Sequence, residues 1–328
     1  MNKFNLACFT SQFLILNRAY TKGLGKAPHK PVLLLVILEM VKVGDLLSNR
    51  VIYDGVFVGH FRNQWKRLVN SGHTPNSALP FFHMRSERKP TFYWRLVIKP
   101  GMDIPITSSH SIKSPRALEE SLEYAEIDLG LYYLMADPVA NEVLRKSLLE
   151  HYFPRAESAS NIQYNIFDQI HNEIVAERKV DYAEHLKKLE ASLKPEEFHE
   201  EVIVRSAVFR KDVLKVYDDT CSVSGLYVTT VGGAQLLDAC HIVPFSESRK
   251  DHITNGICLS PTLHRAFDRG LAFIDDNYRF QLRSDISERE SFHALSLIKN
   301  VSLKLPENKL YWPSREALLR HRQLTGND

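Results

Sequence analysis

The sequence predicts an α+β chain in which two mixed units of helices and strands are joined by a helical connection. Residues 26–47, KAPHKPVLLLVILEMVKVGDLL, have the composition of a helix that is apolar nearly all round and therefore buried. Residues 165–197 are charged and free of glycine. A length of 328 residues exceeds that of a usual single domain. The expected division is 1–156, 157–200 and 201–328.

In the first unit, a helix start is expected at Pro28 to Pro31. Two stretches with strand character, 51–58 and 92–98, are separated by the turn-rich SGHTPNSALP. The segment 114–152 is expected to be helical. Proline marks two helix starts within it, at Pro115 and at Asp137-Pro138, and Phe153-Pro154 ends it.

The connection has apolar residues at helical intervals, among them Ile170, Ile174 and Tyr182. A basic helix near Val202 is expected to open the second unit. Two strand-like runs around Gly232-Gly233 follow, and then the segment NGICLSPTLHRAFDRG, of which the last part is expected to be a helix.

The charge is distributed unevenly along the chain. The net charge is only +3, but residues 1–100 hold 15 Lys and Arg against four acids, and residues 101–200 hold 10 basic against 19 acidic residues. The first hundred residues are therefore the expected electrostatic footprint on a polyanion. The four cysteines show no close pairing and no apolar run reaches membrane-spanning length, which predicts a cytoplasmic protein without a disulfide framework.

One segment of the second unit carries a recognisable order of chemical groups. His241 is followed by Asn255 fourteen residues later and by His264 nine residues after that, within DACHIVPFSE and DHITNGICLSPTLHRAFDRGLAFIDDNY. In order and spacing this segment resembles the HNH nucleases. The resemblance implies the fold of two strands and a helix known as the ββα-metal finger, DNA cleavage, and one divalent ion, with Mg, Mn, Co and Ni left open.

Each residue of this motif has a task in phosphodiester hydrolysis, which needs a base for water and a cation for the developing charge. His241, expected at a strand end, is the natural base because it takes a proton near neutral pH. Asn255 is expected to bond backbone groups and hold its loop and, by resemblance, to keep the imidazole of His241 oriented. His264 and Asp268 are four residues apart on a predicted helix, so both can bind one ion.

The third metal ligand is left open by the sequence. In related HNH enzymes the residue directly before the base often binds the metal, and here that residue is Cys240. Asp238, on the same strand face, is expected to substitute. Many relatives hold a structural zinc with two Cys pairs, but Cys221 and Cys258 each stand alone. No structural zinc is expected, and these two cysteines are interpreted as small buried hydrophobes.

The first unit has a resemblance of its own, carried by APHKPVLLLVIL at 27–38, LPFFHM at 79–84, TFYWRL at 91–96 and LLEHYFP at 148–154. These segments are similar to the sulfur-binding domain of the McrA-type restriction endonucleases, which attack phosphorothioate DNA. The resemblance implies a recognition cavity formed by the following residues: His29, Lys30, Leu79, Pro80 and His83. The sequence departs from the family at Leu79, where an aromatic residue is common, near His83, where a small one is common, and at Lys30, where arginine is frequent.

These residue types suit the target chemically. A sulfur atom that replaces a phosphate oxygen is larger, more polarisable and a poorer hydrogen-bond acceptor, so it favours an apolar wall such as Leu79 and Pro80. The rest of the phosphate remains anionic and is served by a helix start with His29 and Lys30. Base or phosphate contacts are expected from other polar residues of the unit: Arg62, Gln64, Lys66, Arg67, Arg85 and Arg88.

The sequence thus predicts an enzyme that restricts phosphorothioate-modified double-stranded DNA, with no membrane partner. Double-strand cleavage by a single-site enzyme would favour a homodimer. One alternative is an HNH nuclease directed to a methylated or hydroxymethylated base that is flipped onto aromatic side chains. Candidates for that stacking are Phe81, Phe82, Phe92, Tyr93 and Trp94. A second alternative is a DNA-binding regulator without catalysis.

Overall fold

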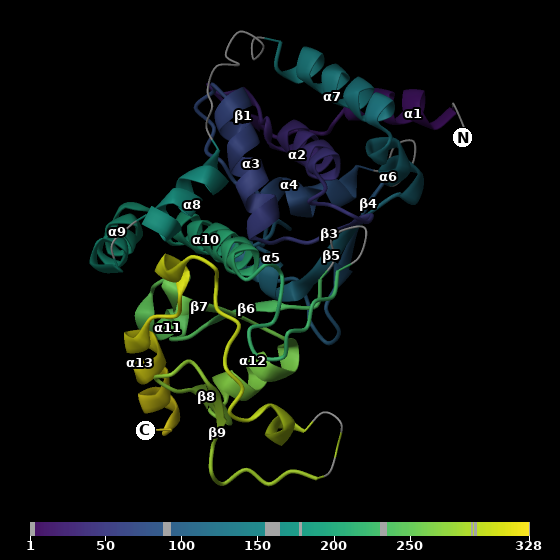
Figure 1. Ribbon diagram of the computed structural model, residues 1–328. Coiled ribbons are helices and arrows are strands. Elements are labelled where there is room, and N and C mark those ends of the chain that lie inside the picture. Colours follow the sequence, from purple (N-terminus) through teal and green to yellow (C-terminus); the bar gives the residue numbers. More distant parts are fainter. Residues whose placement is uncertain are drawn as a thin grey trace. The chain divides into compact units, whose positions relative to one another are not determined.

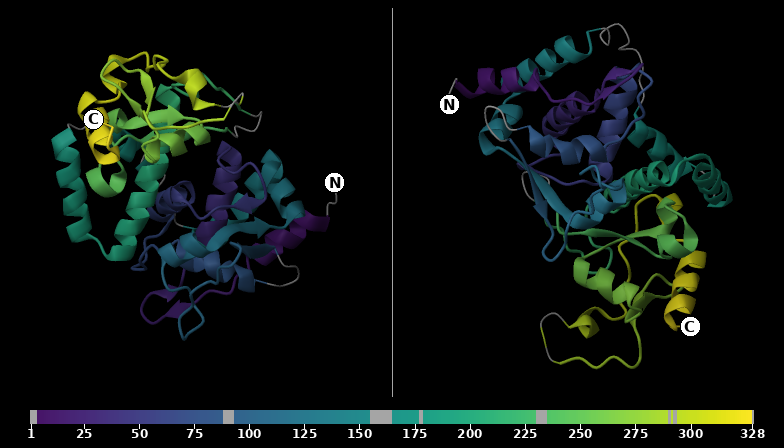
Figure 2. Two further views of the ribbon diagram at one scale, coloured as in Figure 1. Left: turned by 90° about the horizontal axis from the view of Figure 1, so that it is seen from below. Right: turned by 180° about the vertical axis from the view of Figure 1, so that it is seen from behind.

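The computed structural model describes residues 4–87, 93–154, 165–176, 179–229, 235–289, 291 and 294–327 (Figures 1 and 2). The chain divides into two compact units, one of residues 1–167 with 194–204 and one of residues 168–193 with 205–328. Both helices and small sheets are present, and the predicted α+β class is confirmed. Within the described ranges, no helix combines the length and the apolar character needed to span a bilayer.

The first unit consists of helices and two small sheets. Its helices are α1 (Phe4–Phe13), α2 (His29–Val43), α3 (Gly55–Leu68), α4 (Ala78–His83), the 3-10 turn η1 (Met84–Ser86), α5 (Pro115–Ser121), α6 (Leu129–Ala136) and α7 (Pro138–Tyr152). Its strands are β1 (Tyr20–Thr21), β2 (Gly25–Lys26), β3 (Arg50–Val51), β4 (Trp94–Ile98) and β5 (Leu122–Ile127). Strands β3, β5 and β4 form one antiparallel sheet with β5 in the middle.

Helix α2 is the centre of this unit, and it packs against α3, α4, α6 and α7 (Figure 1). Its residues from Lys30 to Leu38 are all buried, as expected for a helix that is apolar all round. The helix ends at Gly44, whose φ of 83° is accessible to glycine at little cost. The helix predicted from the sequence is therefore confirmed.

The strand predicted for residues 51–58 is wrong. Only β3 is extended, and α3 begins at Gly55 because the Asp54 side chain accepts a hydrogen bond from the Phe57 amide at 3.0 Å. Apolar residues that looked like a strand form the buried face of an amphipathic helix instead. Gly59 on this helix faces Phe167, and a Cβ there would lie 2.3 Å from the Phe167 ring.

The helical segment predicted for residues 114–152 contains an unexpected strand. Ser114 caps α5 and Asp137 caps α7, as their positions beside proline suggested, and α7 ends before Phe153. Between them β5 pairs with β3 on one side and β4 on the other. Burial alternates over its last four residues, where Ala125 and Ile127 are buried. The pairing with two neighbouring strands is tertiary and is not encoded in the local sequence.

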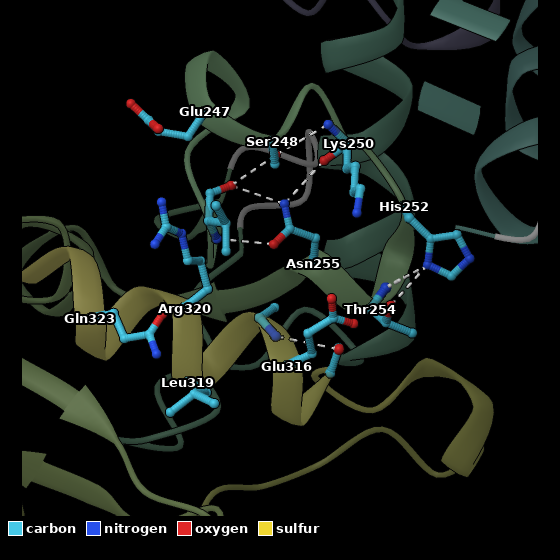
Figure 3. Close-up of a pocket in the computed structure, with 13 residues that line it drawn as sticks. Glu247, Ser248, Lys250, His252, Thr254, Asn255, Glu316, Leu319, Arg320 and Gln323 are labelled. Atoms are coloured by element: carbon cyan, nitrogen blue, oxygen red, sulfur yellow. Dashed lines mark hydrogen bonds between the residues drawn. The ribbon is translucent and has the colours of Figure 1, made fainter. Parts of the chain in front are cut away.

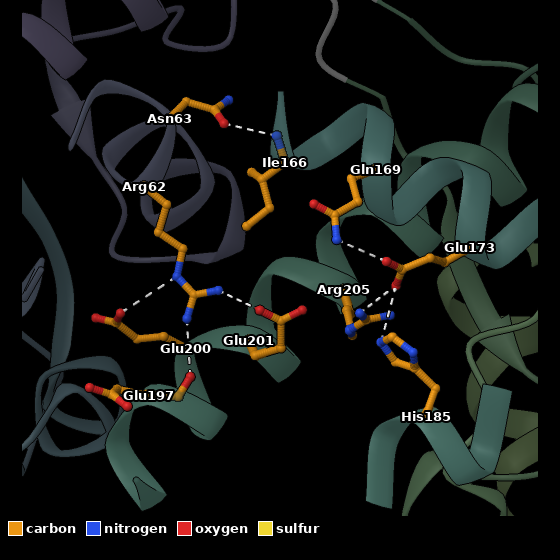
Figure 4. A network of polar contacts seen from close by, with 10 residues as sticks. All are labelled: Arg62, Asn63, Ile166, Gln169, Glu173, His185, Glu197, Glu200, Glu201 and Arg205. Carbon is orange, nitrogen blue, oxygen red and sulfur yellow. Dashed lines mark hydrogen bonds and ion pairs between the residues drawn. The ribbon is translucent and has the colours of Figure 1, made fainter. Parts of the chain in front are cut away.

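Three helices follow: α8 (Ile166–Ala176), α9 (Lys179–Ser192) and α10 (Pro195–Val216). The basic helix predicted to start near Val202 is the later part of α10, which begins at Pro195. These helices are divided between the two compact units: residues 166–167 and 195–204 belong to the first, and residues 168–192 and 205–216 to the second. In the second unit, the buried Arg205 of α10 pairs with Glu173 of α8 at 2.5 Å (Figure 4).

The second unit is built on two short hairpins. Its elements are β6 (Asp238–His241), α11 (Phe245–Ser248), η3 (Ile253–Asn255), β7 (Gly256–Leu259), α12 (Pro261–Asp268), β8 (Ala272–Ile274), β9 (Phe280–Leu282), η4 (Leu295–Ile298), η5 (Lys309–Tyr311) and α13 (Arg315–Thr325). Strands β6 and β7 are antiparallel, and α12 follows them, which is the predicted order of two strands and a helix. The predicted turn at Gly232-Gly233 lies outside the described residues.

Candidate functional site

His241 is the last residue of β6 and pairs with Gly256 of β7. The hairpin approaches α10 so closely that a Cβ on Gly256 would lie 2.4 Å from Val213. Because side chains alternate along a strand, Asp238 and Cys240 share one face and His241 lies on the other. The strand therefore presents the predicted base and the predicted metal ligands in different directions.

The imidazole of His241 is held by two neighbours that the sequence analysis did not identify. Its Nε2 lies 2.8 Å from Oδ1 of Asp251, whose carboxylate is fully buried. Its ring stacks on Phe209 of α10, with centroids 4.0 Å apart and planes 9° from parallel. The His241 side chain keeps 22% of its surface exposed, so the ring remains accessible from solvent.

Asn255 clamps the backbone of its own loop (Figure 3). Its Oδ1 accepts from the Val243 amide at 2.9 Å, and its Nδ2 donates to the carbonyls of Val243 and Lys250, both at 3.0 Å. These bonds close the chain between residues 243 and 255 into a fixed loop. The loop also carries Asp251, whose carboxylate contacts His241.

A candidate metal centre lies on the other face of β6. The donor atoms of Cys240, His264 and Asp268 all lie within 4.8 Å of one another. His264 and Asp268 share one face of α12, and Nε2 of the first is 3.3 Å from Oδ2 of the second. A sulfur, a nitrogen and an oxygen donor form a set that suits a divalent transition metal. Burial raises the pKa of the Cys240 thiol, so the side chain holds its proton until a cation displaces it.

Asp238 lies on the far side of the His264 ring. Its Oδ2 is 3.2 Å from Nδ1 of His264, and its Oδ1 pairs with Arg210 at 3.3 Å. A carboxylate on one ring nitrogen fixes the ring and leaves the other nitrogen free to bind a metal. Asp238 therefore does not belong to the donor cluster of Cys240, His264 and Asp268.

The five residues predicted for the recognition cavity line one cavity of about 740 Å³ in the first unit. His29 and Lys30 come from the first turn of α2, whereas Leu79, Pro80 and His83 come from α4. Additional walls come from residues that the sequence analysis did not select: Arg18, Leu24, His73, Thr74 and Ser111. Residues almost fifty positions apart are thus brought into one site by the packing of α4 on α2.

One of the two cations that line this cavity, Lys30, is paired with an acid. Lys30 is 8% exposed and forms an ion pair with Glu87, which also accepts a hydrogen bond from the Asn17 amide at 3.0 Å. Nε2 of His83 lies 2.9 Å from the Ser111 hydroxyl, and burial followed by the charge of Lys30 lowers the pKa of its imidazole. The wall is therefore mixed: Leu79 and Pro80 are apolar, the charge of Lys30 is paired with Glu87, and Arg18 lies over the Tyr152 ring.

His29 is the most strongly perturbed histidine of the cavity. Its Nε2 lies 3.0 Å from the Thr74 carbonyl, and its ring lies 4.5 Å from that of Trp65. Burial lowers the pKa of His29 to about 4. The imidazole is therefore neutral at physiological pH, with Nε2–H donating to Thr74.

This shift predicts a pH dependence of stability. In the unfolded chain His29 is protonated below its usual pKa of 6.5. In the folded chain it is protonated only below about pH 4. The free energy of unfolding should therefore fall by on the order of 3 kcal/mol between pH 7 and pH 4 through this group. Denaturant unfolding of the wild type and of His29→Gln across that range measures it. Equal pH slopes for the two proteins would contradict the assignment.

The other residues proposed for DNA contact differ in their surroundings. Arg62 of α3 pairs with Glu201 at 2.5 Å and bonds the Glu197 carbonyl at 3.0 Å, so it anchors the first two turns of α10 (Figure 4). Arg85 stacks over the Phe82 ring, and Arg88 lies outside the described residues. Lys66 and Arg67 are exposed on α3.

The aromatic residues considered for base stacking belong to the core. Four of them are at most 2% exposed: Phe81, Phe82, Tyr93 and Trp94. Phe92 lies outside the described residues. Cys221 and Cys258 are likewise buried, and Cys221 Sγ accepts from the amides of Ser224 and Ser260.

Comparisons with known proteins match parts of the chain. Residues 221–275 match the model of a family described as HNH endonuclease. A solved structure described as "Modification dependent TagI restriction endonuclease" is 24% identical with a TM-score of 0.30, over 37% of this chain and 38% of that chain. The match thus spans well under half of that structure's length. No curated protein matches the chain.

Proposed function

Because residues 221–275 form an HNH endonuclease domain, we propose that the protein is a metal-dependent DNA endonuclease directed to phosphorothioate-modified DNA. The observation that carries the catalytic part is the arrangement around β6, with a supported imidazole on one face and three metal donors on the other. The observation that carries the specificity is the cavity on α2 and α4, which combines an apolar wall at Leu79 and Pro80 with the cations Arg18 and Lys30.

In this proposal His241 takes a proton from the attacking water. The group is suited to this because imidazole accepts a proton near neutral pH, and part of its surface reaches solvent. Asn255 holds the loop behind the base. A divalent ion at the donor cluster would stabilise the charge that develops on the phosphate and the leaving oxygen.

The metal ligands in this proposal are Cys240, His264 and Asp268. Asp238 is assigned to orientation in place of the ligand role expected from the sequence, since its bond to Nδ1 of His264 leaves Nε2 for the ion. A thiolate is a soft ligand, so the site should favour Zn, Co or Ni over Mg.

Cobalt binding tests this ligand set. Co²⁺ added to the metal-free full-length chain should produce a sulfur-to-cobalt charge-transfer band in the near ultraviolet, and Cys240→Ala should abolish it. Calorimetry on His264→Ala and Asp268→Ala should show an affinity for Co²⁺ reduced by about 100-fold or more. In Asp238→Asn the affinity for Co²⁺ should fall only about tenfold. Cys258→Ala changes another buried cysteine and should keep the band. A band that survives Cys240→Ala, with binding lost in Asp238→Asn, would restore Asp238 as the ligand.

The cavity suits a phosphorothioate for a physical reason. Leu79 and Pro80 offer an apolar wall to a polarisable sulfur that accepts hydrogen bonds poorly, and neutral His29 adds no charge that would favour an ordinary oxygen. The remaining anionic oxygen needs a cation, and Arg18 and Lys30 both line the cavity.

One assay separates this proposal from its rivals. Plasmids with and without phosphorothioate, and with methylated or hydroxymethylated bases, are incubated with the protein and Mg²⁺, Mn²⁺ or Co²⁺. Cutting of phosphorothioate plasmid alone supports the proposal, and cutting of base-modified plasmid alone favours a base reader. Binding of DNA without cutting under every condition would favour a regulator.

A further inference from the structure

We propose that Asp251 is a positioning residue for the base, and that it holds His241 in the tautomer that carries its proton on Nε2. This inference rests on the proposed nuclease function, because it assigns a role within the same site. Asp251 does not belong to the His, Asn and His motif, and it stands four residues before Asn255 in the segment DHITN.

The carboxylate is placed by the loop that Asn255 closes. Asn255 bonds the carbonyl of Lys250, the residue directly before Asp251, and its own amide donates to the His252 carbonyl at 2.8 Å. Backbone bonds thus anchor the chain on both sides of Asp251. The side chain is fully buried, so its direction toward His241 is set by packing as well as by the hydrogen bond.

Two contacts together restrict the imidazole. Stacking on Phe209, with planes 9° apart, fixes the plane of the ring. The 2.8 Å contact of Nε2 with Asp251 fixes the rotation of the ring within that plane. Both contacts are needed to fix the orientation of the ring. A ring held only by stacking can still rotate within its plane, and a ring held only by one hydrogen bond can still tilt.

The contact also selects the tautomer. A carboxylate oxygen only accepts hydrogen bonds, so Nε2 must carry the hydrogen, and Nδ1 then holds the lone pair that can take a proton from water. The carboxylate further stabilises the imidazolium that forms when that proton arrives. Asparagine at position 251 has the same shape but can donate its amide hydrogen to Nε2, which favours the opposite tautomer.

The same unit contains a matched pair without this role. Asp212 of α10 is nearly buried, and its Oδ2 lies 2.9 Å from Nδ1 of His171, whose side chain is 44% exposed. Asp212→Asn therefore removes a comparable Asp–His contact outside the candidate site. A purely structural contribution of Asp251 would make the two asparagine variants alike.

Nitrogen NMR of the metal-free full-length chain at about pH 8 reads the tautomer directly. The His241 signals are assigned by their loss in His241→Gln. We expect the wild type and Asp212→Asn to show hydrogen on Nε2, and Asp251→Asn to show a large fraction with hydrogen on Nδ1. Hydrogen on Nδ1 in the wild type would overturn the proposal, and this reading needs no cleavage to occur.

Kinetics provide the second readout. Asp251→Asn should lower kcat by about 100-fold or more with KM for DNA unchanged, and Asp212→Asn should leave both within about twofold. Equal kcat in wild type and Asp251→Asn, or equal losses in the two variants, would remove the positioning role. If the wild type cuts no DNA, the nuclease proposal fails while the NMR result still decides the tautomer.

Discussion

Replacement of His241 by alanine is expected to reduce DNA cleavage by about 10²–10⁴-fold while DNA binding stays within about twofold of the wild type. The reason is that the base acts in the chemical step, and removal of a positioned base typically costs that much in rate. Its ring also contacts Phe209 and Asp251, but both are inside the second unit. The recognition cavity is formed by residues of the first unit, so target binding should not depend on this ring.

Single-turnover cleavage of modified plasmid measures the chemical step, and gel shifts in the absence of metal measure binding. His171→Ala is the matched control, because it removes a histidine of the same unit that lies on α8 and pairs with Asp212. Near-normal cutting by His241→Ala would refute the catalytic assignment. Loss of binding in that variant alone would show that the ring contributes to target recognition.

The full-length His241→Ala chain is expected to bind a phosphorothioate duplex at least about tenfold more tightly than the same duplex with ordinary phosphates. Both duplexes carry nearly equal charge, so general electrostatic attraction cannot discriminate between them. The preference must come from the cavity on α2 and α4. Pro80→Asp should erase it, because a carboxylate in the wall repels the anion and removes the apolar contact with sulfur.

Two variants make this test specific. Leu79 is 36% exposed, so Leu79→Asp puts a carboxylate at the same wall with little risk to folding, and it should also erase the preference. Lys66→Ala on the exposed face of α3 should weaken both duplexes equally, or neither, and keep their ratio. Equal affinity of the parent protein for the two duplexes would refute sulfur recognition, and the nuclease assignment would stand without it.

Local patterns predicted several elements correctly because their causes are local. The all-apolar run after Pro28, the proline starts at Pro115 and Pro138, and the i, i+4 pair of His264 and Asp268 depend on helix geometry alone. The predicted secondary structure was wrong where a single capping residue or a strand distant in the sequence determines the element. The Asp54 cap converts an apparent strand into α3, and β5 exists because β3 and β4 lie on either side of it.

The sequence by itself determined the order of chemical groups at the catalytic hairpin, because the spacing of His241, Asn255 and His264 follows from one short run of strand, loop and helix. Tertiary structure decided their partners. Only packing brings Phe209 of α10 onto the base, turns the buried Asp251 toward it, and places Asp238 on the far nitrogen of His264. The residues in these contacts are not spaced along the chain by a helical or strand repeat, so no local pattern predicts that they meet. Side-chain burial and hydrogen bonding in the folded unit bring them together.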